Sequence, residues 1–133
     1  MKKIFFIAAI MLSVTSCSPK IVGTWNIDRY EVDNQQGQNF STRNAGALTI
    51  KKNGTGEKNV QYNMFQNEFS DMESFRWNMQ GEGIITITSS STSSGQRSEF
   101  DKTWIMVTNT NKKQLWRSTD GRNSVQTLEM SKQ

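Results

Sequence analysis

The stretch Phe75–Thr88, "FRWNMQGEGIITIT", contains the clearest pattern in the 133-residue chain. Apolar and polar residues alternate up to the glycine-rich "QGEG", and a second β-rich run, "IITIT", follows. Alternation with a period of two places the apolar side chains on one face of a strand, and a short glycine-containing break joins two such strands in a hairpin. The stretch therefore predicts strands over Glu73–Met79 and Ile84–Thr88, joined by a tight turn.

The same signals recur on both sides of this hairpin, and no long window has the periodicity of a helix. Asn53-Gly54 predicts another tight hairpin, because both turn positions tolerate positive φ. We expect six further strands, at Gly23–Val32, Ala47–Lys52, Gly56–Tyr62, Ser98–Thr108, Gln114–Ser118 and Ser124–Met130.

Eight strands with mostly short connections predict an all-β fold, an eight-stranded antiparallel up-and-down β-barrel. Closure into a barrel removes the unpaired edges of an open sheet. A β-sandwich is the alternative, although it usually needs longer crossovers. Two connections are longer, Asp33–Gly46 and Asn63–Met72, and are predicted to be binding loops, lids or plain linkers. The serine-rich Ser89–Gly95 is expected to be a flexible hairpin loop.

The first residues have the order of an export signal: Lys2 and Lys3, then the apolar run Ile4–Leu12, then small residues. The run is too short to span a bilayer. Val14-Thr15-Ser16-Cys17 resembles the bacterial lipobox. That resemblance implies cleavage before Cys17 and its acylation, for example with palmitate. An ordinary secretory signal with a chance cysteine is the alternative. A lone cysteine cannot form an internal disulfide or a CxxC metal pair.

These signals predict a signal peptide at 1–16, a lipidated tether at 17–22 and a barrel at 23–131. Ser18 follows the cysteine where, by resemblance to enteric-type lipoproteins, aspartate would favour retention in the inner membrane. We therefore expect a lipid-anchored protein of the cell envelope, on the periplasmic face of the outer membrane.

Composition argues against several classes of function. The chain has no histidine, so it lacks the usual general base near neutral pH and the commonest metal ligand. Without residues 1–16 it has 14 basic and 12 acidic residues, a balance of +2 that indicates a solvated surface rather than a nucleic-acid site. Asn44 stands where an EF-hand loop starting at Asp33 would need glutamate. We expect no cofactor, no metal and no enzyme activity.

Gly23-Thr24-Trp25 resembles the G-x-W signature of lipocalins and related calycin barrels. "NGTG" at Asn53–Gly56, the stretch Phe75–Thr88 and "VTNTNKKQL" at Val107–Leu115 resemble later segments of the lipocalin-like domains of bacterial lipoproteins. The resemblance implies that Gly23 and Trp25 close the barrel. Lipocalins often pack a cation over this tryptophan, and the candidates here are Arg117, Arg122 and Lys132.

A barrel of eight strands is just wide enough to be filled by its own side chains or to hold one small ligand. Val60 and Leu115 are also expected to point inward. In "TWIMV", either Trp104 and Met106 or Ile105 and Val107 point inward, and the orientation of Trp116 is equally open. The candidate ligand-binding residues of the barrel interior are Ile27, Leu48, Ile50, Phe75, Trp77, Met79, Ile85 and Ile87.

The sequence thus predicts a membrane-anchored lipocalin-like lipoprotein that binds a small hydrophobic or amphipathic ligand in its barrel. The alternative is a solid-cored interaction module that docks another protein of the cell envelope.

Overall fold

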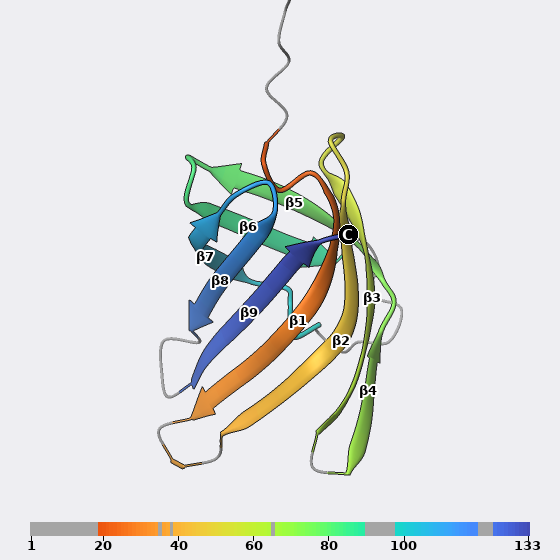
Figure 1. Ribbon diagram of the computed structural model, residues 1–133, viewed down its shortest axis with the longest axis vertical. Coiled ribbons are helices and arrows are strands. Elements are labelled where there is room, and N and C mark those ends of the chain that lie inside the picture. Colours follow the sequence, from red (N-terminus) through yellow and green to blue (C-terminus); the bar gives the residue numbers. More distant parts are fainter. Residues whose placement is uncertain (1–18, 35, 38, 65, 90–97, 120–123) are drawn as a thin grey trace, which may run out of the picture.

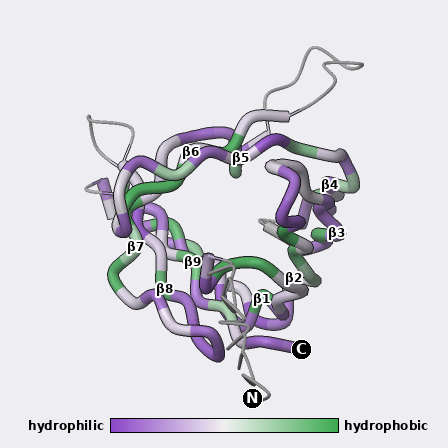
Figure 2. The backbone as a smooth tube through the Cα atoms, turned by 90° about the horizontal axis from the view of Figure 1, so that it is seen from above, coloured by the Kyte–Doolittle hydropathy of each residue, from purple (hydrophilic) through white to green (hydrophobic). Residues whose placement is uncertain are grey.

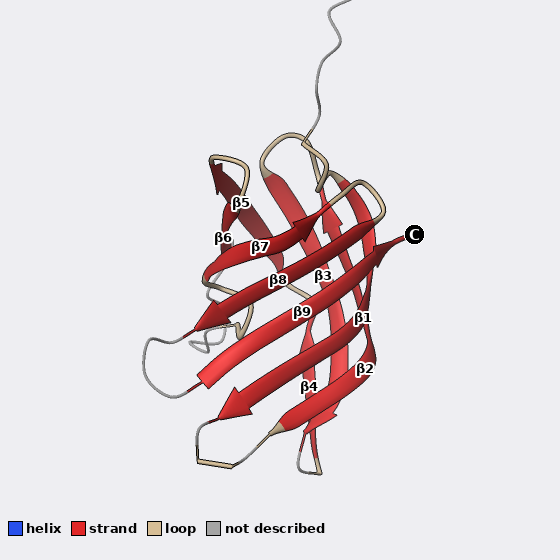
Figure 3. Ribbon diagram, turned by 60° about the vertical axis from the view of Figure 1, so that its left-hand side comes forward, coloured by secondary structure: helices blue, strands red, loops and turns tan. Residues whose placement is uncertain are grey.

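The computed structural model describes residues 19–34, 36–37, 39–64, 66–89, 98–119 and 124–133. All regular secondary structure in these ranges is β-strand (Figure 3). They contain no helix long and apolar enough to cross a membrane. The strands are β1 (Gly23–Asn34), β2 (Phe40–Ile50), β3 (Thr55–Met64), β4 (Asn67–Asp71), β5 (Ser74–Gln80), β6 (Ile84–Ser89), β7 (Thr103–Asn109), β8 (Lys113–Thr119) and β9 (Ser124–Lys132).

The strands form one closed antiparallel barrel (Figures 1 and 2). Their order is β2-β1-β9-β8-β7-β6-β5-β3-β4, and the pairing of β2 with β3 closes the ring. β4 pairs with one half of β3 and β5 with the other half, so together they occupy one position. The predicted eight-stranded up-and-down barrel is confirmed.

The two ends of the barrel differ. At the closed end lie the start of β1 and the turns 51–54, 81–83 and 110–112. At the loop end β1, β3 and β8 end, and β2, β4 and β9 begin. The first described residues and the C-terminus are both at the closed end (Figure 1).

A bulge in β1 decides which side chains enter the barrel. The register of β1 with both β2 and β9 shifts between Ile27 and Arg29. One extra residue reverses the alternation of faces. Trp25 and Ile27 therefore point inward before the bulge, and Tyr30 points inward after it. Opposite the bulge, β2 passes through Asn44, whose φ is 53°.

Three predicted boundaries are wrong. β2 begins at Phe40, so much of the predicted long loop Asp33–Gly46 is strand, paired with β1. Likewise, the predicted loop Asn63–Met72 contains β4. In both segments polar side chains alternate with isolated aromatic ones, which masks the period of two. β7 begins at Thr103 rather than Ser98. Most of the serine-rich segment, from residue 90, and the predicted turn at Asp120-Gly121 lie outside the described residues.

Trp25 seals the closed end. It is fully buried, and its indole Nε1 donates to the carbonyl of Ile21 at 2.7 Å. Lys132 is the cation over this ring, with Nζ 4.9 Å from the centroid and donating to the carbonyl of Val22 at 2.9 Å. Arg117 is exposed on β8, and Arg122 lies outside the described residues. Gly23 has a φ of 142°, which other residues rarely adopt, and a Cβ there would also displace the end of the Lys132 side chain.

The orientation of β7 and β8 is also settled. Trp104 and Met106 point inward, whereas Ile105 and Val107 are 58% and 53% exposed. On β8, Trp116 is fully buried. The prediction that Leu115 points inward is therefore wrong, because neighbours on a strand face opposite sides.

The signal peptide and Cys17 lie outside the described residues. Residues 19–22, which the sequence assigns to the tether, lie against the barrel: they form a turn in which the amide of Val22 donates to the carbonyl of Pro19 at 3.0 Å. Ile21 is fully buried within the core.

Candidate functional site

The residues predicted to bind a ligand all face the core. Trp77 and Met79 are partly buried and pack against the core cluster, and the other six are at most 1% exposed: Ile27, Leu48, Ile50, Phe75, Ile85 and Ile87. The Trp77 indole donates to the carbonyls of Lys51 and Thr55, at 2.9 and 3.1 Å, and so braces the β2–β3 turn. Contact of these eight residues with a ligand stays a prediction.

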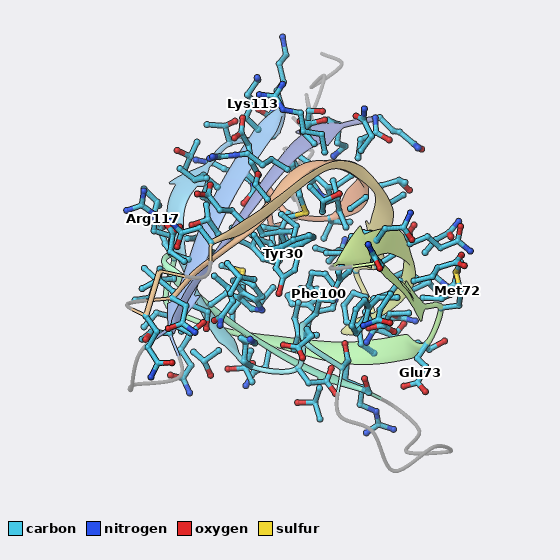
Figure 4. The ribbon with its side chains drawn as sticks, turned by 90° about the horizontal axis from the view of Figure 1, so that it is seen from below. Tyr30, Met72, Glu73, Phe100, Lys113 and Arg117 are labelled. Atoms are coloured by element: carbon cyan, nitrogen blue, oxygen red, sulfur yellow. The ribbon has the colours of Figure 1, made fainter. Side chains whose placement is uncertain are left out.

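A second group of rings lies toward the loop end. Tyr30 and Tyr62 have centroids 5.5 Å apart, and Tyr62 stacks on Phe69 at 5.4 Å with an interplanar angle of 12°. Phe40 lies 5.8 Å from Tyr62, and Phe100 lies 5.3 Å from Tyr30. These five residues form the loop-end aromatic cluster. Viewed from below, Tyr30 and Phe100 lie inside the ring of strands, whereas Met72 and Glu73 lie at its periphery (Figure 4).

Both tyrosine hydroxyls are held in the neutral form. Burial, followed by the charges of Glu99 and Asp71, raises the pKa of Tyr62 to about 12. Burial also raises the pKa of Tyr30, with smaller contributions from Tyr62 and Glu99. The cluster is therefore an uncharged aromatic surface throughout the physiological pH range.

Next to the rings, Lys58 points into the barrel with a side chain that is 0% exposed. Its Nζ lies 3.0 Å from Asp71 Oδ2 and 3.7 Å from Asp101 Oδ1, and it donates to Ser89 Oγ at 3.1 Å. Ser89 donates in turn to Asp101 at 2.8 Å, and Ser98 donates to Asp71. Removing an ammonium from water costs several kcal/mol, and the two carboxylates and the hydroxyl around Lys58 offset that cost.

This Lys58 cluster spans a seam in the wall. Among the described strands β4 pairs only with β3, and no ladder joins it to β6 or β7. Ser98 and Asp101 come from the connection between β6 and β7, and Asp71 ends β4. Their polar contacts through Lys58 therefore replace the missing backbone hydrogen bonds.

Gln126 is a buried polar residue with an unpaired side-chain oxygen among the described residues. It lies on β9 opposite Val32, and it is 6% exposed. Its Nε2 donates to Ser124 Oγ at 2.8 Å, but its Oε1 has no hydrogen-bond partner among the described residues. A buried polar atom left unpaired costs about 1–3 kcal/mol.

Sequence reasoning missed most of this region. Lys58 shares the alternation of Val60 and Tyr62, which was a usable signal, but lysine is rarely buried. Tyr30 is concealed by the bulge, and Phe69 lies in a segment predicted to be a loop. Within the described part of the chain, no three His, Cys, Asp or Glu residues gather as metal ligands do.

Replacing Lys58 by methionine should destabilise the barrel by about 3 kcal/mol, because it leaves two partly buried carboxylates without their counter-charge. Lys51→Met is the matched control: that lysine pairs with Glu57 at 3.1 Å on the surface, where a pair contributes about 0–1 kcal/mol. Urea unfolding followed by tryptophan fluorescence measures both. The triple variant Lys58→Met/Asp71→Asn/Asp101→Asn should recover most of the loss. Equal stability of the two single variants would contradict this role for Lys58.

The tyrosines give a direct titration, because Tyr30 and Tyr62 are the only two in the chain. Absorbance at ~295 nm should show no tyrosinate step near the ordinary pKa of about 10 in the folded protein, and a full step there in denaturant. Since the folded pKa values lie above the unfolded ones, the stability that they confer is complete below about pH 10 and is lost as the pH rises through 12. A normal step in the folded protein would refute burial of the cluster.

Comparison with known proteins agrees with this geometry. The closed barrel is similar to the crystal structure of a lipocalin-like protein from Bacteroides uniformis ATCC 8492, with a TM-score of 0.53 and 11% sequence identity, covering 86% of this chain and 99% of that one. At this identity the likeness establishes the fold alone. No curated protein matches the sequence. The sequence profile of the lipocalin-like domain matches residues 21–115, and the chain therefore belongs to the lipocalin-like domain family.

Proposed function

We propose that this protein is a membrane-anchored lipocalin-like lipoprotein that binds a small apolar or amphipathic molecule without covalent chemistry. The loop-end aromatic cluster is the ligand's contact surface. The observation that carries the proposal is the gathering of five aromatic rings at the end of the barrel opposite the sealed floor.

The position of the cluster supports this assignment. Trp25 is fully buried at the closed end. Trp104 and Trp116 are fully buried further along the barrel, 6.3 Å apart, and Trp104 lies 6.4 Å from Phe100. Buried rings therefore fill the interior from the closed end up to the cluster. Phe40 and Phe69 at the loop end are only partly buried. A ligand can cover their remaining apolar surface without displacing the core. Full burial of an exposed apolar side chain contributes about 1.5–3 kcal/mol, and these partly buried rings offer a part of that.

An amphipathic ligand fits better than a purely apolar one. Gln126 projects from β9 into the same end of the barrel, and its Oε1 lacks a partner. A polar group on the bound molecule would satisfy the amide while the rest of the molecule contacts the rings. Small-molecule sites commonly combine an apolar lining with a few such polar groups.

Binding is proposed in preference to catalysis. Lys58 lies between two carboxylates, and Ser89 already donates its proton to Asp101. These contacts give the cluster a structural role across the seam, and the chain contains no histidine to act as a general base near neutral pH.

The anchor rests on the lipobox-like Val14-Thr15-Ser16-Cys17. One acyl chain holds a protein only marginally, and stable attachment requires at least two. A lipobox cysteine receives more than one, which supports stable attachment to a membrane. Ser18 after the cysteine, where aspartate would favour the inner membrane, supports the periplasmic face of the outer membrane.

The ligand site can be tested with the neutral apolar probe N-phenyl-1-naphthylamine, whose fluorescence rises on binding. Phe69→Ala, at the loop end, should weaken probe binding by about tenfold, from the lost burial of one ring. Met79→Ala is the matched control, since Met79 is also partly buried but lies near the closed end. It should change the binding by less than about twofold, because that half is filled by packed side chains.

If Met79→Ala weakened probe binding more than Phe69→Ala, the ligand site would lie among the interior residues predicted from the sequence, which include Met79. Absence of probe uptake in the folded wild type would contradict ligand binding. It would favour the solid-cored interaction module, with the exposed face of Ile105 and Val107 as its docking surface.

The anchor makes a separate prediction. In cells fed labelled palmitate, the wild-type protein should carry the label and fractionate with the outer membrane. Cys17→Ser should carry none and appear as an unlipidated precursor or a soluble form. Continued labelling of the serine variant would sink the lipobox assignment.

A further inference from the structure

The closed end of the barrel is rich in lysine. The turn 51–54 contributes Lys51 and Lys52, and the backbone amide of Lys132 donates to the carbonyl of Lys112 at 2.9 Å. Lys113 begins β8 opposite Ser131, and Lys20 precedes β1. All six side chains are exposed, and together they form the closed-end lysine face: Lys20, Lys51, Lys52, Lys112, Lys113 and Lys132.

Few acidic groups offset this face. Glu57 pairs with Lys51 at 3.1 Å, Glu82 lies in the turn 81–83, and Asp28 accepts a hydrogen bond from Ser131, opposite Lys113, so six lysines and three acidic groups balance at +3. The remaining described side chains include six basic and eight acidic groups, a balance of −2. Five of the six lysines have no ion pair among the described residues: Lys20, Lys52, Lys112, Lys113 and Lys132. The positive charge of the domain is thus concentrated at one end.

The chain also enters the barrel at this end. Pro19 and Ile21 lie against the closed end, and Lys132 donates to the carbonyl of Val22 there. Between Cys17 and Pro19 the chain can span at most about 7 Å. That length is comparable to the screening length of about 8 Å at physiological ionic strength.

The geometry points to a second membrane contact: the closed-end lysine face docks on the headgroups of anionic phospholipids, in the same bilayer that holds the acyl chains. The short distance between this face and the bilayer rests on the lipid anchor of the proposed function. The attraction of the lysines to anionic headgroups does not depend on that anchor. A nearby anionic surface attracts each lysine with a strength that decays over the screening length, and several lysines on one face act together.

Docking by this face fixes the orientation of the barrel. The loop-end aromatic cluster is at the opposite end, so it faces away from the bilayer. The ligand would then arrive from the aqueous side or from a partner protein, rather than directly from the bilayer beneath the domain.

The test uses the mature acylated protein, purified from bacterial membranes and reconstituted on vesicles of phosphatidylcholine alone or mixed with phosphatidylglycerol. A fluorophore is attached at Asn111→Cys, in the closed-end turn, or at Asn39→Cys, at the loop end. Both positions are exposed. Quenching by a headgroup spin-labelled lipid reports which end is near the membrane.

On anionic vesicles at low salt, the probe at position 111 should be quenched several-fold more than the probe at position 39. High salt, or vesicles of phosphatidylcholine alone, should remove the difference. Lys52→Gln/Lys112→Gln/Lys113→Gln should weaken docking by roughly fivefold per lysine, or about a hundredfold in total. The matched comparison uses two double variants that each remove two charges: Lys112→Gln/Lys113→Gln should weaken docking, whereas Arg43→Gln/Arg117→Gln, at exposed positions away from the closed-end turns, should leave the difference intact.

Each contrary result overturns the docking. The docking is wrong if the two probes are quenched equally, or if quenching is independent of salt and of lipid charge. It is also wrong if the lysine and arginine variants have equal effects. Failure of the anchor is distinguishable, because the protein would then leave the vesicles in high salt and its mass would lack acyl chains. Unequal, salt-sensitive quenching of such an unacylated protein would still support the docking.

Discussion

The buried ammonium of Lys58 is the constraint around which the loop-end half of this barrel is arranged. It brings together Asp71 from the end of β4 and Asp101 from the connection before β7, across a seam where no strand ladder exists. The seam exists because β4 and β5 share one position along β3, and only β5 pairs with β6. An apolar side chain could fill the same space but could not join the two segments.

The two halves of the interior follow from this arrangement. Between the Lys58 cluster and the closed end, tryptophans and aliphatic side chains fill the barrel as far as Trp25, over whose ring the Lys132 ammonium lies. On the other side, the wall is held by polar contacts. Tyr30 and Tyr62 are buried there, and their neighbours Phe40 and Phe69 are only partly buried. A rigid floor and a more accessible aromatic end suit a binding protein. The lysines outside the floor would hold that accessible end away from the bilayer.

Much of the fold was predictable because most strands alternate regularly. In Phe75–Thr88 nothing interrupts the period of two, and the predicted hairpin is close to β5 and β6. The same alternation gave wrong or missing predictions where a strand is irregular or where a charged residue is buried. The extra residue near Asp28 reverses the alternation of β1, and so it moves Tyr30 to the inside. Lys58 violates the expectation that charge is exposed, and its partners lie 13 and 43 residues further along the chain, beyond the reach of any local pattern. The long-range contacts of the loop end therefore had to be seen in the folded barrel.

Native mass spectrometry of the protein, purified gently from its own envelope and compared before and after organic extraction, tests the central claim of ligand binding most directly. The account predicts one reproducible small molecule, bound in proportion to the protein and lost on extraction. An unliganded mass, with no uptake from a native lipid extract, would contradict it. The aromatic cluster would then simply be the loop-end part of a filled core.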